Sequence, residues 1–244
     1  MMLEGRNAVM EALRAGMPLK RIVISENTKP DRAVDEIARL AQRGGVAVEQ
    51  RARKELDRMS ERGAHQGVIA EARPFRYTPL SEVLASTRGQ DPSIIIALDH
   101  VTDPGNFGAI ARTAEVVGAA GIVTTKRRSA AVTPAAWKSA AGALAHVPVA
   151  QEPNLVRALE QCKEQGYWVA GASERAKADL WSSPLEGRLV LVMGSEGEGL
   201  ARLTIETCDF LVSLPQAGKV GSLNVAQATT ALAYEWMRRS RESS

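Results

Sequence analysis

Residues 188–235 decide the fold of this chain, and they run RLVLVMGSEGEGLARLTIETCDFLVSLPQAGKVGSLNVAQATTALAYE. An apolar run at 189–193 stops at a glycine-rich loop, 194–199. A second apolar run, 210–214, stops at another loop, 215–221. Short apolar runs that end at Gly or Pro are typical of β-strands. Because ligands of open α/β sheets lie at the carboxyl ends of strands, the two loops predict one shared ligand pocket.

The composition is ordinary for a globular protein that buries its own core. Hydrophobic residues make up 45% of the 244 residues, and charged residues make up 24%. A chain of this length buries about 70–75% of its unfolded surface, so it needs no disulfide or metal to fold. Cys162 and Cys208 lack metal-ligand spacing and fit a reducing cytoplasm. We expect a cytoplasmic protein with no metal site.

No membrane segment is expected. No apolar run is long enough to span a bilayer. The first residues, MMLEGRNAVMEALRAG, carry acids and lack the apolar core of a signal peptide.

The excess positive charge lies in the first third of the chain. Residues 1–75 contain 14 Lys and Arg against 11 Asp and Glu, whereas the remaining residues contain 17 of each. Nucleic acids bind where positive charge gathers. The asymmetry therefore indicates a polyanionic partner for the N-terminal region, although an ordinary solvated face is the alternative.

Two α/β domains are expected. Near the N-terminus, helical periodicity alternates with short apolar runs; the helices are expected at 4–15, 31–42 and 54–60, and the strands at 21–25, 46–48 and 67–70. Two prolines in residues 73–80 break this pattern. We predict a small α/β domain at 1–72, a linker at 73–88 and a larger domain at 89–244.

The larger domain is predicted to be a mostly parallel sheet with helices on both faces. Residues 94–98, IIIAL, are wholly apolar, as in a strand buried on both faces. Further strands are expected at 121–125, 146–149, 168–172, 189–193 and 210–214, with helices at 81–86, 108–118, 133–143, 153–165 and 225–237. Strands that alternate with helices over this length predict parallel pairing.

A polar loop follows the most apolar strand and leads to Asn106 and Arg112. Residues 99–112 read DHVTDPGNFGAIAR. Small and apolar neighbours predict that Arg112 points from a packed helix towards the end of the sheet. Two plainer interpretations stay open, in which Asn106 caps the helix and Arg112 is a surface charge.

Two later segments also place polar residues in loops. The loop 194–199 has three glycines and two glutamates, and carboxylates repel phosphate. The GxGxxG spacing of dinucleotide sites is absent as well. Glu196 is either a functional acid or a solvated turn residue. Ser222 and Asn224 precede the last helix, where capping alone would explain them.

Together, the three segments resemble the three motifs of the SpoU (TrmH) branch of the SPOUT RNA methyltransferases. Asn106 and Arg112 resemble that family's Asn-x(5)-Arg motif. Residues 191–199 resemble its Gly-x-Glu-Gly-x-Gly motif, and residues 214–225 resemble its motif that ends in Ser-Leu-Asn-Val. The order and spacing of all three make the resemblance specific.

The N-terminal region extends the resemblance to one subgroup. Residues 3–9, LEGRNAV, and 65–68, HQGV, resemble segments of a small RNA-binding domain. That domain occurs in the RlmB-like enzymes, which 2′-O-methylate a guanosine of large-subunit (23S) ribosomal RNA. The chain departs from the family at Ala226-Gln227, where Ser and a small apolar residue are more usual, and at Lys219.

The resemblance implies a fold, a cofactor and an assembly that spacing alone does not. The larger domain would be a SPOUT domain whose C-terminal chain forms a deep trefoil knot. S-adenosylmethionine would bind the knot loops, mainly through backbone groups, at Gly194, Gly199, Leu214, Gly218 and Leu223. Family members are homodimers in which both subunits build each active site.

The catalytic residues implied by the resemblance are Asn106, Arg112, Glu196, Ser222 and Asn224. The reaction would move a methyl group in line from a sulfonium to a ribose 2′-oxygen, so alignment and proton removal are required. Family proposals make the arginine the base, but a guanidinium stays protonated. We therefore expect Arg112 to clamp the RNA and Glu196 to hold Arg112 by a bidentate pair.

Alternative functions remain open. The same chemistry would also suit a tRNA or another rRNA site. An RNA-binding module without catalysis is disfavoured by the intact motif residues, and a nucleotide-dependent oxidoreductase by the missing GxGxxG. His65 and His146 are expected to be structural, whereas His100 is a secondary candidate for a substrate contact.

Overall fold

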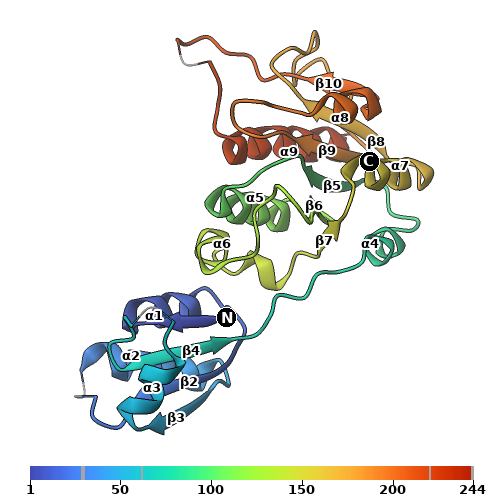
Figure 1. Ribbon diagram of the computed structural model, residues 1–244. Coiled ribbons are helices and arrows are strands. Elements are labelled where there is room, and N and C mark those ends of the chain that lie inside the picture. The colour runs from blue at the N-terminus through green and yellow to red at the C-terminus, as the bar shows by residue number, and fades with distance from the viewer. Residues whose placement is uncertain (29–30, 62, 220, 243–244) are drawn as a thin grey trace. The chain divides into compact units, whose positions relative to one another are not determined.

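The computed structural model divides the chain into two compact units, Met1–Arg76 and Tyr77–Ser244. The structure describes residues 1–28, 31–61, 63–219 and 221–242. Val220, inside the predicted loop 215–221, lies outside the described residues. Each unit contains its own sheet (Figure 1).

The first unit is a four-stranded mixed sheet with helices. Its strand order is β1-β4-β2-β3, in which β2 and β3 are parallel and the other pairs are antiparallel. The elements are β1 Met2–Glu4, α1 Arg6–Arg14, β2 Leu19–Ser25, α2 Arg32–Arg43, β3 Ala47–Arg51, α3 Arg53–Met59 and β4 Val68–Ala72. The predicted alternation is confirmed, but β1 was missed because three residues are too few to show a strand pattern.

The second unit is a six-stranded parallel sheet in the order β10-β8-β9-β5-β6-β7. Its elements are α4 Leu80–Ser86, β5 Ser93–Leu98, α5 Pro104–Val116, β6 Gly121–Thr125, α6 Pro134–Ala140, β7 Val149–Glu152, α7 Leu155–Glu164, β8 Trp168–Ala172, β9 Arg188–Met193, α8 Arg202–Thr207, β10 Phe210–Val212 and α9 Val225–Glu242. The predicted α/β fold with a mostly parallel sheet is confirmed.

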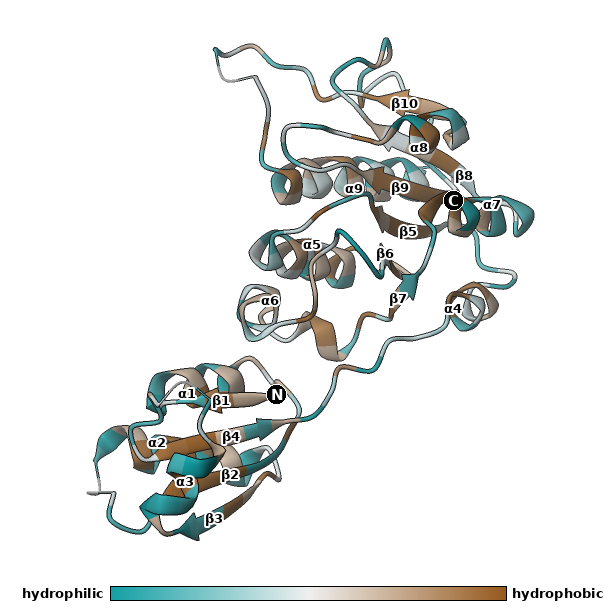
Figure 2. Ribbon diagram, viewed as in Figure 1, coloured by the Kyte–Doolittle hydropathy of each residue, from teal (hydrophilic) through white to brown (hydrophobic). Residues whose placement is uncertain are grey.

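Helices cover both faces of this sheet. On one face, α4, α7 and α8 pack with apolar side chains of β5 and β9, including Ile95 and Val190. Figure 2 shows β5 and β9 in brown between more hydrophilic helices. Helix α4 lies inside the stretch predicted as a linker, yet its buried Leu80 and Val83 belong to this core.

On the other face, α5 packs against α6 and α9. Gly108 lets α5 and α6 approach closely, because a Cβ at this position would lie 2.3 Å from the Ala136 carbonyl oxygen. The Thr113 and Thr230 hydroxyls, 2.8 Å apart, join α5 to α9. After β10 at the sheet edge, the chain therefore returns to pack α9 against α5 and β9. The implied trefoil knot stays a prediction.

Several element boundaries differ from the prediction for local reasons. Helix α5 begins at Pro104, four residues early, because Asp103 rather than Asn106 caps it. Strand β7 begins at Val149, at the end of the expected range 146–149. The delay arises because α6 is followed by left-handed Ala141 and a 3-10 turn occupies Ala143–Ala145. Helix α8 was not predicted. In the described part of the chain, no helix is long and apolar enough to cross a membrane.

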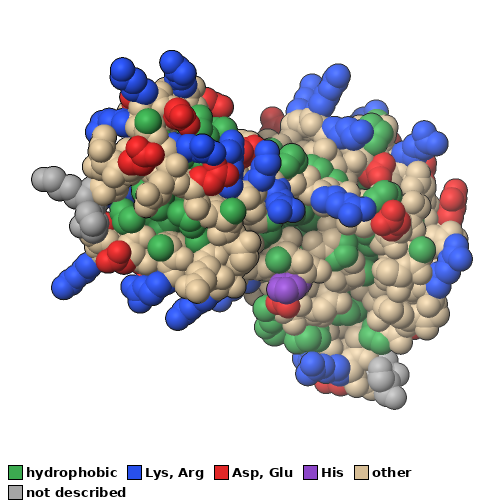
Figure 3. Space-filling model, turned by 90° about the horizontal axis from the view of Figure 1, so that it is seen from below, with side chains coloured by type: hydrophobic (Ala, Val, Ile, Leu, Met, Phe, Trp, Pro, Cys, Tyr) green, Lys and Arg blue, Asp and Glu red, His purple; other side chains and the backbone are tan. Residues whose placement is uncertain are grey.

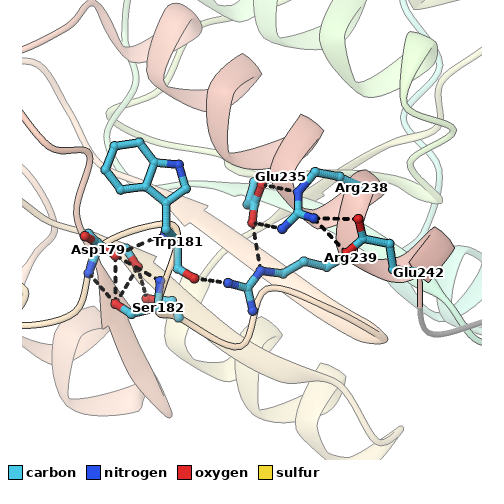
Figure 4. Close-up of polar contacts among 8 residues, drawn as sticks. Asp179, Trp181, Ser182, Glu235, Arg238, Arg239 and Glu242 are labelled. Carbon is cyan, nitrogen blue, oxygen red and sulfur yellow. Dashed lines mark hydrogen bonds and ion pairs between the residues drawn. The ribbon is translucent and has the colours of Figure 1, made fainter.

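An ion cluster ties the end of α9 to the chain before β9 (Figure 4). The Glu235 side chain, 9% exposed, accepts hydrogen bonds from Arg238 at 2.8 and 2.9 Å and from Arg239 at 2.8 Å. Arg239 also donates to the Trp181 carbonyl oxygen. Arg238 chiefly, together with Arg239, lowers the pKa of the Glu235 carboxyl from 4.5 to about 2.

Glu235→Gln is expected to lower the free energy of unfolding at pH 7 by about 1–3 kcal/mol, because charge-assisted bonds are lost. The folded-state pKa of Glu235 lies below its unfolded value, so its stabilisation is present above pH 4.5 and fades towards pH 2. The difference in free energy of unfolding between wild type and variant should therefore shrink as the pH falls from 5 to 3. Denaturant titrations at steps of about one pH unit measure this difference. A difference that stays constant over this range would exclude a role for the charge.

Candidate active site at the carboxyl ends of the strands

Three polar segments leave the second sheet at the carboxyl ends of β5, β9 and β10. Strands β5 and β9 are direct neighbours along their full lengths. The Asp99 amide donates to the Met193 carbonyl oxygen at 2.8 Å, so pairing continues past the end of β5. The loops after β5 and β9 therefore start side by side.

Glycines shape the loop after β9 into a pinched turn. The backbone groups of Ser195 and Gly199 exchange hydrogen bonds of 3.1 and 3.0 Å. A Cβ on Gly194 would lie 2.3 Å from the Gly199 carbonyl carbon, so a larger residue would open the turn. Gly197 and Gly199 have φ angles of 96° and 69°, which favour glycine. Glu196 lies exposed in this turn, between the paired residues Ser195 and Gly199, which we call the neck of the turn.

Asn106, Glu196 and Asn224 form a hydrogen-bonded cluster, which we call the amide–carboxylate cluster. Asn106 Nδ2 donates to Glu196 Oε1 at 3.0 Å, and Asn224 Nδ2 donates to the same oxygen at 2.7 Å. Asn224 Nδ2 also donates to Asn106 Oδ1 at 2.8 Å. One residue from each of the three motif segments thus meets at one point.

The cluster also fixes the start of α9. Asn224 Oδ1 accepts from the Ala226 amide at 2.9 Å, as an N-cap residue does. The Val225 amide lies 3.4 Å from Glu196 Oε1. Because this carboxylate accepts charge-assisted bonds from both amides, it orders two side chains that would otherwise rotate freely.

The two plainer interpretations of the first motif have different outcomes. Asn106 is not the helix cap, because the Asp103 carboxylate accepts from the Asn106 amide at 2.7 Å. Arg112 is exposed, and it makes no hydrogen bond or ion pair with any residue that the structure describes. The expected Glu196–Arg112 pair does not form within the described residues of one chain, and between two chains it stays a prediction. Six residues along a helix turn about 240° around its axis, so Arg112 leaves α5 in a different direction from Asn106.

The remaining predicted residues do not join the hydrogen bonds of the cluster. Gly194 and Gly199 shape the turn, and half-buried Leu214 follows β10. Gly218 is exposed, and a side chain there would meet nothing within 4 Å. Ser222 is exposed and bonds to none of the described residues.

These loops suit a cationic, partly apolar cofactor better than a polyphosphate. Glu196 and Glu198 on the glycine turn complement a positive charge and repel phosphate. Leu223 is 50% exposed beside the cluster residue Asn224, which leaves apolar surface for a flat ring to cover. Among the described residues, no group of His, Cys, Asp and Glu could hold a metal ion.

Asp99 and His100 form a pair next to this site, and His100 was only a secondary candidate for a substrate contact. Asp99 is 2% exposed, and its Oδ1 lies 2.6 Å from His100 Nδ1. Its Oδ2 accepts from the Ala201 amide at 2.8 Å. The signal for this pair was present in the sequence, as an acid and a histidine directly after a wholly apolar strand.

In the first unit, much of the positive charge is paired. Arg21 bonds to Glu71 at 2.9 Å and to Glu49 at 3.2 Å, and Lys20 bonds to Glu71 at 3.0 Å. Figure 3 shows Lys and Arg side chains mixed with Asp and Glu over this unit. His65 is structural, as expected, because it is 3% exposed, bonds to Asp57 and accepts from the Gly67 amide.

Comparison with known families matches both units. The family model of the SpoU rRNA methylase family matches residues 93–234, which include all three motif segments. A second model, described as RNA 2′-O ribose methyltransferase substrate binding, matches residues 2–78.

Individual relatives match over nearly the whole chain. YacO of Bacillus subtilis, assigned to the TrmH family of tRNA/rRNA methyltransferases, is 42% identical over 237 residues, 96% of this chain and 94% of the relative. An AdoMet-bound rRNA methyltransferase from Sinorhizobium meliloti is 28% identical with a TM-score of 0.67, covering 98% of this chain and 86% of that one. The SpoU methyltransferase AviRb from Streptomyces viridochromogenes, with AdoMet, shares the fold at 23% identity and a TM-score of 0.69, covering 100% and 91%.

Proposed function

Since this chain belongs to the SpoU rRNA methylase family of tRNA/rRNA methyltransferases, we propose that it methylates a ribose 2′-oxygen, that of a guanosine in 23S ribosomal RNA. The cofactor of this family is S-adenosylmethionine. The observation that carries the proposal is the amide–carboxylate cluster, which joins three segments far apart in the sequence. Such an RNA substrate places the reaction in the cytoplasm.

The bound cofactor supplies a methyl group on a positively charged sulfonium. The chain's own residues align the ribose oxygen with that group, and alignment is the largest part of the task. The Glu196 carboxylate holds the Asn106 and Asn224 amides, which then face the substrate as fixed dipoles. Gly194, Gly199, Leu214, Gly218 and Leu223 form the proposed cofactor loops, while Ser222 offers a hydroxyl with no partner among the described residues.

We place Arg112 in the active site of a second copy of the chain. The cluster has no cation of its own chain bonded to it, whereas Arg112 projects from α5 without a partner among the described residues. Two apolar side chains lie exposed on the same pair of packed helices, Val116 at 56% on α5 and Tyr234 at 44% on α9. A homodimer formed through these helices would cover them and would bring Arg112 to the partner's cluster, where it clamps the RNA.

The first unit is proposed to bind the RNA substrate. Support comes from its match to a substrate-binding family and from its excess of Lys and Arg. The relative YacO is described as a tRNA/rRNA methyltransferase, so tRNA methylation is the second candidate function.

The test is incubation of the protein with methyl-labelled S-adenosylmethionine and total RNA, both ribosomal and transfer, from cells that lack the protein. We expect label in 23S rRNA at a single guanosine and none in 16S rRNA. Label in tRNA alone would replace the proposed substrate with the second candidate. RNA binding without transfer would identify a non-catalytic binding module, and neither binding nor transfer would refute the proposal.

A further inference from the structure

A polar hollow lies beside the amide–carboxylate cluster and shares its glycine turn. Its volume is about 530 Å³, and it is lined by His100, Arg128, Ser195, Glu198, Gly199, Leu200 and Ala201. Ser195 and Gly199 form the neck of the turn that carries Glu196. A ligand in this hollow would therefore lie next to the reacting ribose.

Backbone strain is concentrated at this hollow. Among the described residues, the non-glycine residues with positive φ are Gln66, His100, Arg128 and Ala141. Two of these, His100 at 60° and Arg128 at 56°, line the hollow although they come from different loops. Left-handed backbone is unfavourable for such side chains, and strain of this kind persists where the surrounding structure or a function requires it.

Hydrogen bonds hold both strained residues in place. The loop after β6 is closed by Thr125 Oγ1, which donates to the Arg127 carbonyl oxygen at 2.7 Å. The Ala130 amide then donates to the Val101 carbonyl oxygen at 2.8 Å, which fastens this loop to the chain next to His100. These hydrogen bonds fix the two loops, so Arg128 and His100 are held in the lining of the same hollow.

The chemistry of His100 follows from Asp99. The buried Asp99 carboxylate lies 2.6 Å from His100 Nδ1, so Nδ1 carries the proton and donates. Nε2 is then the ring nitrogen left to bond a ligand, and it has no partner among the described residues. Arg128 likewise has no ion pair within the described chain, and it adds a cation to the same hollow.

We propose that this hollow binds the nucleotide adjacent to the methylated one, with His100 Nε2 hydrogen-bonded to its ribose 2′-hydroxyl and Arg128 contacting its phosphate. The proposal rests on the proposed function, because it places a neighbouring nucleotide of the same RNA. Arginine suits a phosphate, and the 2′-hydroxyl is the group that separates RNA from DNA. Glu198, also in the lining, keeps the phosphate on the Arg128 side by charge repulsion.

The test uses 23S rRNA fragments with one deoxynucleotide on the 5′ or the 3′ side of the methylated guanosine. In wild type, the deoxynucleotide on one side should raise the KM for RNA about ten-fold, the cost of one lost hydrogen bond. The variant His100→Gly should raise the KM for all-ribose RNA by a similar factor. It should show no further response to the deoxynucleotide, because the partner is already gone.

His100→Gly suits this test because glycine accepts a φ of 60° without strain. Because the variant leaves Asp99 Oδ1 without its partner, its unfolding midpoint should fall, whereas its affinity for S-adenosylmethionine should stay close to that of wild type. Arg128→Asn should also raise the KM for RNA, since Asn tolerates left-handed backbone but carries no charge. Arg127→Asn, one residue earlier and outside the hollow, is the matched control and should have little effect.

Several outcomes would overturn the site. If each deoxynucleotide raised the KM of wild type and of His100→Gly by the same factor, His100 would not contact the ribose. A fall in kcat at unchanged KM would make His100 part of the chemistry instead of the RNA contact. If wild type transfers no methyl group even to all-ribose RNA, the proposed function fails first and this site fails with it.

Discussion

Glu196→Ala is expected to lower methyl transfer about 10²–10³-fold, the usual cost of losing a preorganised polar group at a reacting centre. Oε1 of Glu196 accepts from both Asn106 and Asn224, so the variant releases both amides at once. The side chain is exposed, and the fold should therefore survive. The measurements are the single-turnover transfer rate to 23S rRNA and the unfolding midpoint.

Glu196→Gln separates geometry from charge. All the hydrogen bonds to this side chain that the structure gives end on one oxygen, Oε1, which an amide oxygen can replace. If the carboxylate acts mainly by holding the amides, Gln should keep far more activity than Ala. If both variants lose activity equally, the negative charge itself is required. Full activity of Glu196→Ala would show that methyl transfer does not occur at the cluster.

Arg112→Lys is expected to lose about 10²-fold or more of methyl transfer, because an ammonium cannot reproduce the planar fork of a guanidinium. Cofactor affinity should change little, since Arg112 lies outside the proposed cofactor loops. Calorimetric binding of S-adenosylmethionine and transfer to 23S rRNA are the paired measurements. Equal losses of binding and transfer would contradict the assigned role of an RNA clamp.

Mixing two inactive variants tests whether Arg112 acts in the partner subunit. A dimer of Arg112→Lys and Glu196→Ala chains has one complete site if the arginine crosses the interface, and none if it acts within its own chain. Random pairing of equal amounts should therefore restore about a quarter of the wild-type sites. No recovery, with mixed dimers demonstrated by two different tags, would place Arg112 in its own subunit's site.

The strands and helices of the larger unit followed from the sequence because buried parallel strands are wholly apolar. Residues 94–98 and 189–193 were recognisable for this reason, and they became the paired strands β5 and β9. Short elements without such a pattern were not predicted. Helix α8 has six residues and no side-chain cap, so neither periodicity nor a start signal marked it.

The site was predicted in its residues but not in its bonds. The family resemblance selected Asn106, Glu196 and Asn224, and the structure brings these together. It could not assign Glu196 its partners, because any of several nearby donors fits a carboxylate. The pair with Arg112 does not form within one chain, because that residue leaves α5 in a different direction from Asn106. The orientation of His100 depended on left-handed backbone, which a sequence pattern does not reveal.

The chemical nature of the product tests the central claim most directly. The 23S rRNA methylated by wild type with labelled S-adenosylmethionine is hydrolysed in alkali, which cleaves after every nucleotide that has a free 2′-hydroxyl. The account predicts that the label remains in an alkali-stable dinucleotide that begins with guanosine, and that Glu196→Ala removes this signal. Label released in single nucleotides would mean that the methyl group is on a base, and it would contradict ribose methylation at the amide–carboxylate cluster.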